Sequence, residues 1–174
     1  MRPLTEKQLR AAFINTSQRE RAAIVPPAGL DALRWSELDY LGWRDRRQPN
    51  VGYVVVELGG GDGAADADGG GGFVGVMLRQ TEARARSRPQ CSWCDDVTLP
   101  NDVVFFGAKR AGQAGRNGDT VGALVCSEFE CSANVRKLPP LAYPGFDREA
   151  ARLQRIAALR QHATAFVLAV RAGG

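Results

Sequence analysis

The sequence predicts an α+β fold in which β-hairpins are flanked by short N-terminal helices and a long C-terminal helix. Three observations indicate this class. β-rich segments bracket glycine-rich stretches in the middle of the chain, and apolar residues recur at helical spacing near the C-terminus. Four cysteines form two close pairs, Cys91–Cys94 and Cys126–Cys131. The 174 residues suit one domain of ordinary size with helical additions.

Residues 1–45 are expected to form an N-terminal helical cap. Thr5 to Gln8 and Ser17 to Glu20 both match a capping box, in which side chains satisfy open backbone N–H groups at a helix start. Pro26-Pro27 ends the second helix, because proline cannot continue an α-helix. The aromatic residues that follow are expected in the core: Trp35, Tyr40 and Trp43.

A first hairpin is expected at the start of the central segment, 46–138. The β-rich stretches 51–58 and 73–78 bracket the glycine-rich residues 59–72, which predicts a hairpin with a long flexible tip. The aspartates in this tip do not follow the spacing of an EF-hand loop. No Gly-Lys-Ser/Thr follows the glycines, so the tip is not expected to be a phosphate loop either.

The two cysteine pairs predict one structural zinc ion held by Cys91, Cys94, Cys126 and Cys131. Each pair offers two thiolates from one turn, and a gap of 31 residues lets the fold bring the turns together. Such a site has no open coordination position for chemistry. The alternatives are two disulfides, an iron–sulfur cluster or a redox-active Cys-x-x-Cys. Disulfides need an oxidising compartment, and the N-terminus does not resemble a signal peptide.

The order of elements around the cysteines predicts a treble-clef zinc finger. Strands are expected at 102–108 and 120–125, joined by a basic glycine-rich loop at 109–119, and a helix at 128–136. A zinc ribbon would instead place both cysteine pairs on hairpin tips. Residues 139–174 are expected to pack on the same domain, with a last helix from about Asp147 to Arg171 whose apolar stripe faces the core.

The charge of the chain is mildly basic, with a net value of +4. Residues 1–78 carry 9 Lys and Arg against 10 Asp and Glu, whereas residues 79–174 carry 14 against 9. The cysteine-bearing half is therefore the basic half, which suits an acidic protein or RNA as partner. No apolar run approaches the ~20 residues of a membrane helix, so no membrane contact is expected.

Several motifs carry a family resemblance. They are Leu41-Gly42-Trp43, Cys91-Ser92-Trp93-Cys94, the strand 103–106 and the stretch 118–126 that ends in the third cysteine. With them, nearly the whole chain apart from the glycine tip resembles the FusB-type elongation factor G-binding proteins, which have a C-terminal treble-clef zinc finger. Residues 4–7 and the loop 110–116 resemble its short, actinobacterial-type members.

The resemblance implies a cytoplasmic zinc protein that binds elongation factor G, modulates its release from the ribosome and gives fusidic acid tolerance, without being an enzyme. The chain departs from the resistance proteins because it lacks their large N-terminal helical domain. It also has Gln90 and Leu124 where they carry aromatic residues near the cysteines. A monomer is expected. The partner is expected to contact the basic loop and the turn beside it: Arg110, Arg116, Leu124 and Phe129.

Two other function classes stay open. The runner-up is a ribosome- or RNA-associated binding protein, because cations near the cysteines could contact phosphates. These cations are Arg84, Arg86, Arg88, Lys109, Arg110, Arg116, Arg136 and Lys137. An enzyme is the third class, but the single histidine, His162, is expected to be a surface or packing residue. Asp95-Asp96 is expected to form a turn, so the sequence offers no convincing base and nucleophile.

Overall fold

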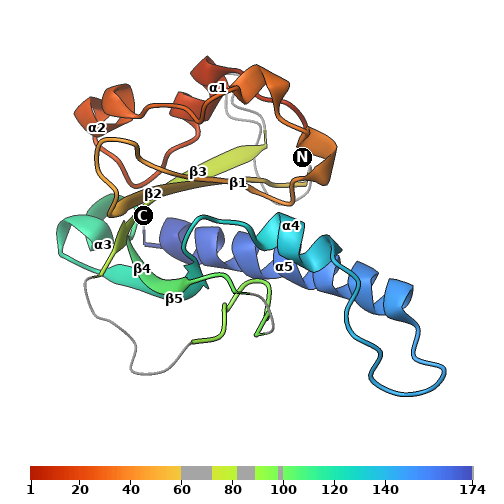
Figure 1. The fold of residues 1–174 in the computed structure, drawn as a ribbon. Helices are drawn as coiled ribbons and strands as arrows, with labels where there is room; N and C mark the ends of the chain where they lie inside the picture. Colours follow the sequence, from red (N-terminus) through yellow and green to blue (C-terminus); the bar gives the residue numbers. More distant parts are fainter. Residues whose placement is uncertain (60–71, 82–88, 98–99, 174) are drawn as a thin grey trace.

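The computed structural model describes residues 1–59, 72–81, 89–97 and 100–173. Within these residues, five strands form one antiparallel sheet in sequence order. Figure 1 shows the short N-terminal helices on one side of the first three strands and the long C-terminal helix, α5, on the other. The predicted α+β class is confirmed. The strands are β1 Leu41–Arg44, β2 Val51–Glu57, β3 Phe73–Gln80, β4 Val103–Lys109 and β5 Thr120–Cys126.

The N-terminal helices begin where the sequence places them. Helix α1 spans Glu6–Ala11 and α2 spans Gln18–Ala23, and each is preceded by a complete capping box on Thr5 or Ser17. Two 3-10 turns follow, at Leu30–Ala32 and Trp35–Glu37. Strand β1 lies inside the aromatic cluster, where the sequence indicated core residues but no strand.

Strand β2 separates two hydrophobic cores, because successive side chains of a strand point to opposite faces. Val51, Tyr53 and Val55 face the helices of the first 40 residues, and we call this cluster the N-terminal core. Val54 and Val56 face α5 and the cysteines, in what we call the cysteine-side core.

The two clusters have different members. The N-terminal core consists mainly of Leu4, Leu9, Phe13, Ile24, Leu30, Trp35, Leu41, Trp43, Val51, Tyr53, Val55 and Phe73. The cysteine-side core includes Tyr40, Val76, Leu78, Trp93, Phe106, Val125, Phe129, Val135 and the four cysteines, together with the buried face of α5.

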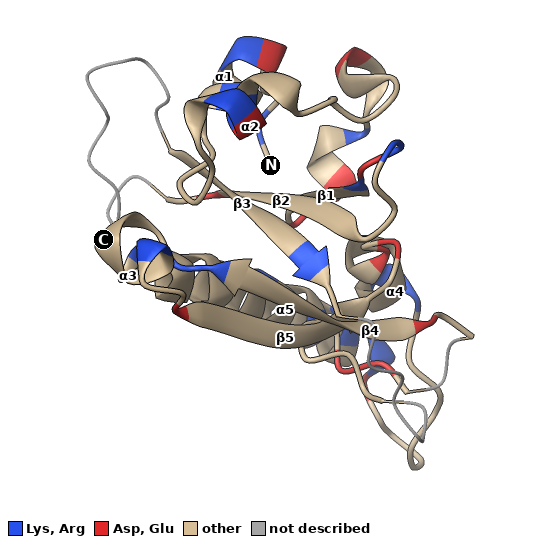
Figure 2. Cartoon of the chain, turned by 90° about the vertical axis from the view of Figure 1, so that its left-hand side faces the viewer, with Lys and Arg blue, Asp and Glu red and all other residues tan. Residues whose placement is uncertain are grey.

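Helix α5, Arg148–Arg171, begins one residue after the predicted start. The Asp147 side chain accepts a hydrogen bond from the Ala150 N–H and caps it. Figure 2 shows β4 and β5 lying over α5. The predicted apolar stripe is buried at five positions: Leu159, Ala163, Phe166, Val167 and Val170. Among the described residues, no helix combines the length and apolar character needed to cross a bilayer.

The structure differs from two of the predicted elements. The predicted loop at 109–119 contains a short helix, α3 (Gly112–Arg116), which docks on the end of α5. Its contacts are hydrogen bonds from the Ala111 N–H to the Val170 carbonyl at 2.9 Å and from the Ala114 N–H to the Gly173 carbonyl at 3.3 Å.

Helix α4 spans Cys131–Arg136 and begins three residues later than predicted, because Phe129 has a left-handed backbone with φ of 60°. Most of the predicted glycine tip, residues 60–71, lies outside the described residues.

Candidate metal centre

Two turns from different parts of the chain bring the four cysteines together. Cys91 and Cys94 belong to a tight turn in which the Asp95 N–H donates to the Cys91 carbonyl at 3.0 Å. This turn docks on the sheet, because the Ser92 N–H donates to the Leu124 carbonyl of β5 at 2.7 Å. Cys126 is the last residue of β5 and Cys131 is the first of α4. The order turn, strand, strand and helix start is the one predicted for a treble clef.

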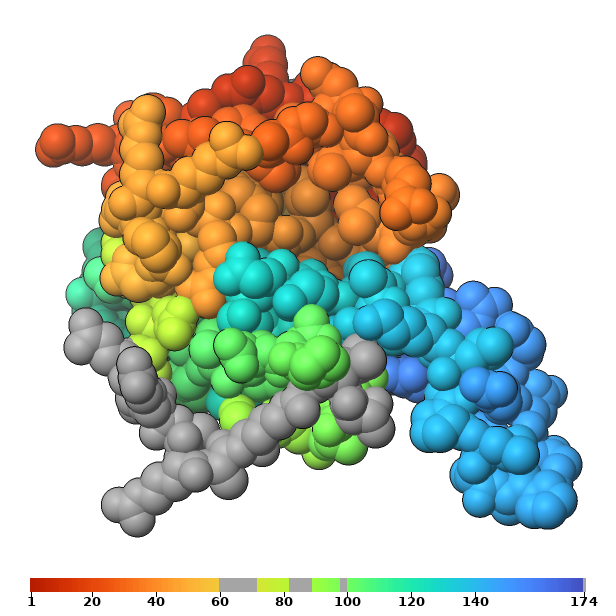
Figure 3. Space-filling view, in the orientation of Figure 1, coloured from red at the N-terminus to blue at the C-terminus, as the bar shows by residue number. Residues whose placement is uncertain are grey.

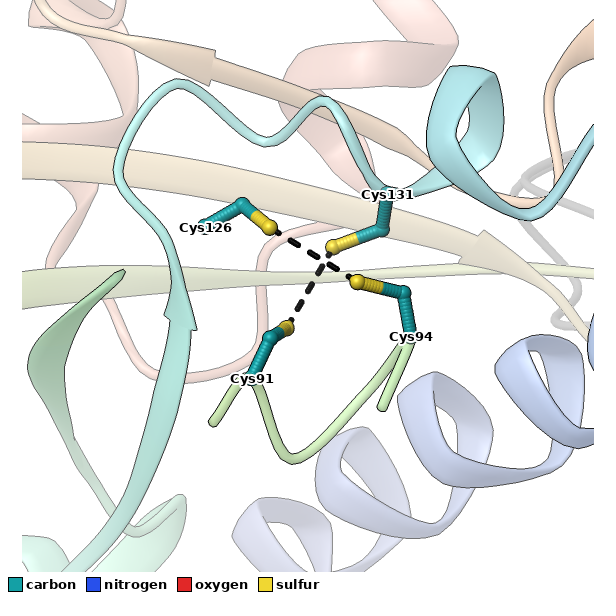
Figure 4. A group of neighbouring side chains, drawn as sticks. All are labelled: Cys91, Cys94, Cys126 and Cys131. Carbon is teal, nitrogen blue, oxygen red and sulfur yellow. Dashed lines mark hydrogen bonds between the residues drawn. The ribbon is translucent and has the colours of Figure 1, made fainter. Parts of the chain in front are cut away.

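The sulfur atoms of this group lie at distances that suit a single tetrahedral ion. All four lie within 4.8 Å of one another. The Cys91 and Cys131 sulfurs are 3.7 Å apart, and so are those of Cys94 and Cys126 (Figure 4). Four thiolates around one zinc ion, with bonds of about 2.3 Å, would place their sulfurs about 3.8 Å apart. Disulfide sulfurs lie about 2 Å apart, and all four thiols here are free and buried.

The pKa values of the buried thiols are shifted in opposite directions. Hydrogen bonds from the neighbouring thiols, that of Cys126 above all, hold the pKa of Cys91 far below its ordinary range. The Cys126 contact and burial instead raise the pKa of Cys131. Four thiolates in one apolar site repel each other, so a bound cation is what allows all of them to ionise.

Two polar hydrogen atoms point at the sulfurs, one from the Cys91–Cys94 turn and one from α4. The backbone N–H of Trp93 donates to Cys91 Sγ at 3.4 Å. On α4, the amide Nδ2 of Asn134 donates to Cys126 Sγ at 3.6 Å, and the Asn134 residue is 1% exposed. Hydrogen bonds of this kind favour the charged form of a thiolate and orient it for a metal. Asn134 therefore belongs to the surroundings of the metal site, although it was not among the residues predicted for it.

The segment Asp39-Tyr40 ties both cysteine turns to the rest of the fold. The Tyr40 hydroxyl donates to the Phe129 carbonyl at 3.2 Å, and its ring meets the Trp93 ring edge to face at 5.1 Å. Burial, followed by the nearby Cys131 sulfur, raises the pKa of Tyr40, so it remains a neutral donor. The buried Asp39 carboxylate pairs with Arg136 of α4 and Arg160 of α5.

The two arginines predicted to contact a partner differ in their surroundings. Arg110 is partly engaged within the protein, because its Nη1 donates to the Ala169 carbonyl near the end of α5 at 2.8 Å. Arg116 is exposed at the end of α3, where its Nε donates to the Gln113 side chain at 3.0 Å. Partner binding by these residues stays a prediction, and Arg116 has the more accessible guanidinium.

The two predicted apolar contacts also differ. Leu124 is half-buried on β5, opposite Phe105 of β4. Phe129 is 6% exposed, and its ring stacks on Phe106 with centroids 5.1 Å apart. The left-handed backbone at Phe129 turns its ring inward, toward Gly42 and Gly52 of the neighbouring strands. Phe129 is therefore a core residue in this structure, and its ring is covered where the prediction required an accessible one.

The remaining candidate residues are spread over the molecule. Of the cations considered for phosphate contacts, Lys109 and Lys137 are exposed, whereas Arg136 pairs with Asp39. Arg84, Arg86 and Arg88 lie outside the described residues. His162 Nδ1 lies 3.1 Å from the Trp93 carbonyl, to which it can donate, and Asp96 pairs with Arg155 at 2.7 Å. Both contacts fasten the Cys91–Cys94 turn to α5.

The comparisons with known proteins agree with this geometry. The family model described as "FBP C-terminal treble-clef zinc-finger" matches residues 8–170, nearly the entire chain. No curated protein and no solved structure gives a match.

Proposed function

Because the chain belongs to the FBP C-terminal treble-clef zinc-finger family, we propose that it is a zinc-binding protein that binds elongation factor G. In this proposal it modulates the release of the factor from the ribosome and so gives tolerance to fusidic acid. The observation that carries the proposal is the family match over residues 8–170 together with four clustered cysteines. The resemblance described above supplies the partner.

The proposed metal is one zinc ion per chain, bound by Cys91, Cys94, Cys126 and Cys131. Sulfur distances of 3.7 Å in two opposite pairs support a single small ion in a closed, four-thiolate site. When bound, zinc supplies no reaction there but joins the Cys91–Cys94 turn to β5 and α4. Metal analysis of the purified protein should give close to one equivalent of zinc. A folded protein without metal contradicts this assignment.

The partner is tested by mixing the purified chain with purified elongation factor G, with and without ribosomes. We expect a stable complex without ribosomes, and faster release of the factor from ribosomes stalled by fusidic acid. A chain that binds neither free nor ribosome-bound factor contradicts the proposed function.

A second candidate function is direct binding to ribosomal RNA. The exposed side chains of Lys109 and Arg116, near the two ends of the α3 region, support it. Contacts to phosphates would make binding weaken steeply as salt concentration rises. Steeply salt-dependent binding to ribosomes that lack elongation factor G favours this alternative, whereas binding that requires the factor favours the first proposal.

A further inference from the structure

One end of the molecule projects from the rest. Residues 137–147, which we call the arm, join α4 to α5 and lie beside the first turns of α5. Figures 1 and 3 show this arm extending away from the sheet. Of its 11 residues, all but Pro139 and Phe146 are exposed.

The arm and the first turns of α5 together carry most of the large exposed hydrophobic side chains among the described residues. Among the described residues, six large hydrophobic side chains are exposed, and four lie between positions 138 and 153. Their exposures are 46% for Leu138, 63% for Leu141, 60% for Tyr143 and 59% for Leu153. Single exposed hydrophobic residues need no explanation, but a cluster at one end of a protein usually marks an interaction site.

The arm is held in one shape in spite of its exposure. Arg148 Nε of α5 donates to the Pro139 carbonyl at 2.7 Å, and Arg155 Nη1 donates to the Lys137 carbonyl at 3.3 Å. The Tyr143 and Phe146 rings pack edge to face at 5.3 Å across a turn. A segment already fixed before binding loses little conformational entropy when a partner covers it.

The charges around the arm indicate the chemistry of the partner. Residues 136–160 carry 6 Lys and Arg against 2 Asp and Glu, and three of these arginines (Arg136, Arg155 and Arg160) pair with carboxylates outside this range, Asp39 and Asp96. Lys137 and Arg148 make no ion pair with any described residue, whereas Asp147 caps α5 and Glu149 pairs with Arg152. An acidic protein surface could supply carboxylates that pair with Lys137 and Arg148.

We propose that the arm and the first turns of α5 dock into an apolar groove, rimmed by carboxylates, on a protein partner. The arm projects, so the complementary surface is concave. Leu141 and Tyr143 would fill the centre of the contact, and the cations would meet the acidic rim.

The test rests on the proposed function and uses purified elongation factor G with the full chain. Leu141→Glu and Leu141→Lys both remove the same apolar contact, but only Glu brings a like charge to an acidic partner. We expect each to weaken binding at least about tenfold, with the larger loss for Glu. The difference between them should shrink at high salt. Val97→Glu and Val97→Lys change a residue that is 60% exposed outside the arm and should leave affinity unchanged.

The outcomes separate this inference from the function on which it rests. If the unmodified chain does not bind the factor, both the proposed function and the role of the arm are contradicted. If the unmodified chain binds and the Leu141 variants bind equally well, only the role of the arm is contradicted. Equal losses of affinity for Leu141→Glu and Leu141→Lys would contradict the acidic rim proposed for the partner's groove. Two further outcomes also contradict the proposed role of the arm. One is flotation with phosphatidylglycerol vesicles that depends on the arm, and the other is a dimer that depends on the arm, in either case without arm-dependent binding of the factor. Melting temperature and zinc content confirm folding, and Tyr143→Ser replaces any Leu141 variant that does not fold.

Discussion

On one face of the sheet, aromatic and aliphatic side chains fill a core that contains no cysteine, whereas on the other face the packing converges on four sulfurs. In the N-terminal core, Phe13 meets Trp43 and Tyr53 edge to face, with ring centroids 6.2 and 5.6 Å apart. In the cysteine-side core, Trp93 lies between Tyr40 and Phe166, inside the turn that carries Cys91 and Cys94. One core is therefore closed by side-chain packing, and the other contains the proposed metal site.

The tryptophans report on the two cores separately. Trp35 and Trp43 belong to the N-terminal core, and Trp93 belongs to the cysteine-side core. Fluorine NMR of a fluorotryptophan-labelled protein therefore shows which core responds to a change. A fold in which both cores always responded together would remove the distinction.

The largest effect is expected from Cys126→Ser. Metal binding and folding are linked at such sites, so the variant should lose zinc and most of the order of the cysteine-side core. The Trp93 resonance should move to its unfolded position, and those of Trp35 and Trp43 should move less. Ser127→Ala, one position along, is the control and should keep its zinc. Native spectra and an unchanged melting temperature for Cys126→Ser would contradict the metal-dependent core.

Phe13→Ala should break the other core without removing the metal. Phe13 is 1% exposed, and truncating a buried phenylalanine costs about 3–5 kcal/mol of unfolding free energy. Urea unfolding measures this loss, and metal analysis should still give the zinc content of the unmodified protein. If Phe13→Ala loses zinc under native conditions, the two cores are not independent.

Asp39→Asn tests the connection between the regions. The substitution removes the charge that Arg136 and Arg160 share, and we expect a loss of about 2 kcal/mol in unfolding free energy. Thermal melting measures it. Asp31→Asn, which changes an exposed aspartate, is the matched control and should melt like the unmodified chain. Equal melting temperatures for both variants would show that the buried carboxylate does not fasten α4 and α5 to the segment that precedes β1.

Asn134 should have the smallest effect on the fold and a measurable one on the metal. Without its hydrogen bond to Cys126, zinc affinity should fall about tenfold in Asn134→Leu. Asn134→Asp should lose more, because a carboxylate repels the thiolate. Competition with a chelating dye measures affinity, and the cobalt–thiolate absorption band reports on the sulfur directly. Unchanged affinity in both variants would make Asn134 a packing residue only.

Local sequence signals predicted much of this arrangement. The capping boxes at Thr5 and Ser17, the stripe of α5 and the cysteine spacing each depend on neighbours within a few residues or on one repeated interval. These features need no knowledge of the tertiary fold, and the structure has them near the predicted positions. The family match confirms the resemblance that the motifs indicated.

The missed features depend on contacts between distant segments. Helix α3 contains two glycines and forms because the end of α5 accepts its backbone hydrogen bonds. Asp39 lies 97 residues from one arginine partner and 121 from the other. The inward ring of Phe129 follows from a positive φ that nothing in its local sequence requires. Asn134 was the one exception, because its position three residues after Cys131 places both side chains on the same face of a helix.

The position of Phe129 has a consequence for how related sequences can change. A Cβ atom at Gly42 would lie 2.7 Å from the Phe129 side chain, and one at Gly52 would lie 2.6 Å from its ring. The Phe129 side chain, from the turn between Cys126 and Cys131, therefore occupies the space that a side chain at position 42 would need, although the two positions are far apart in the chain. We expect these positions to covary in an alignment of homologues, so that a larger residue at 42 or 52 accompanies a smaller one at 129. Independent variation at the three positions would contradict this coupling.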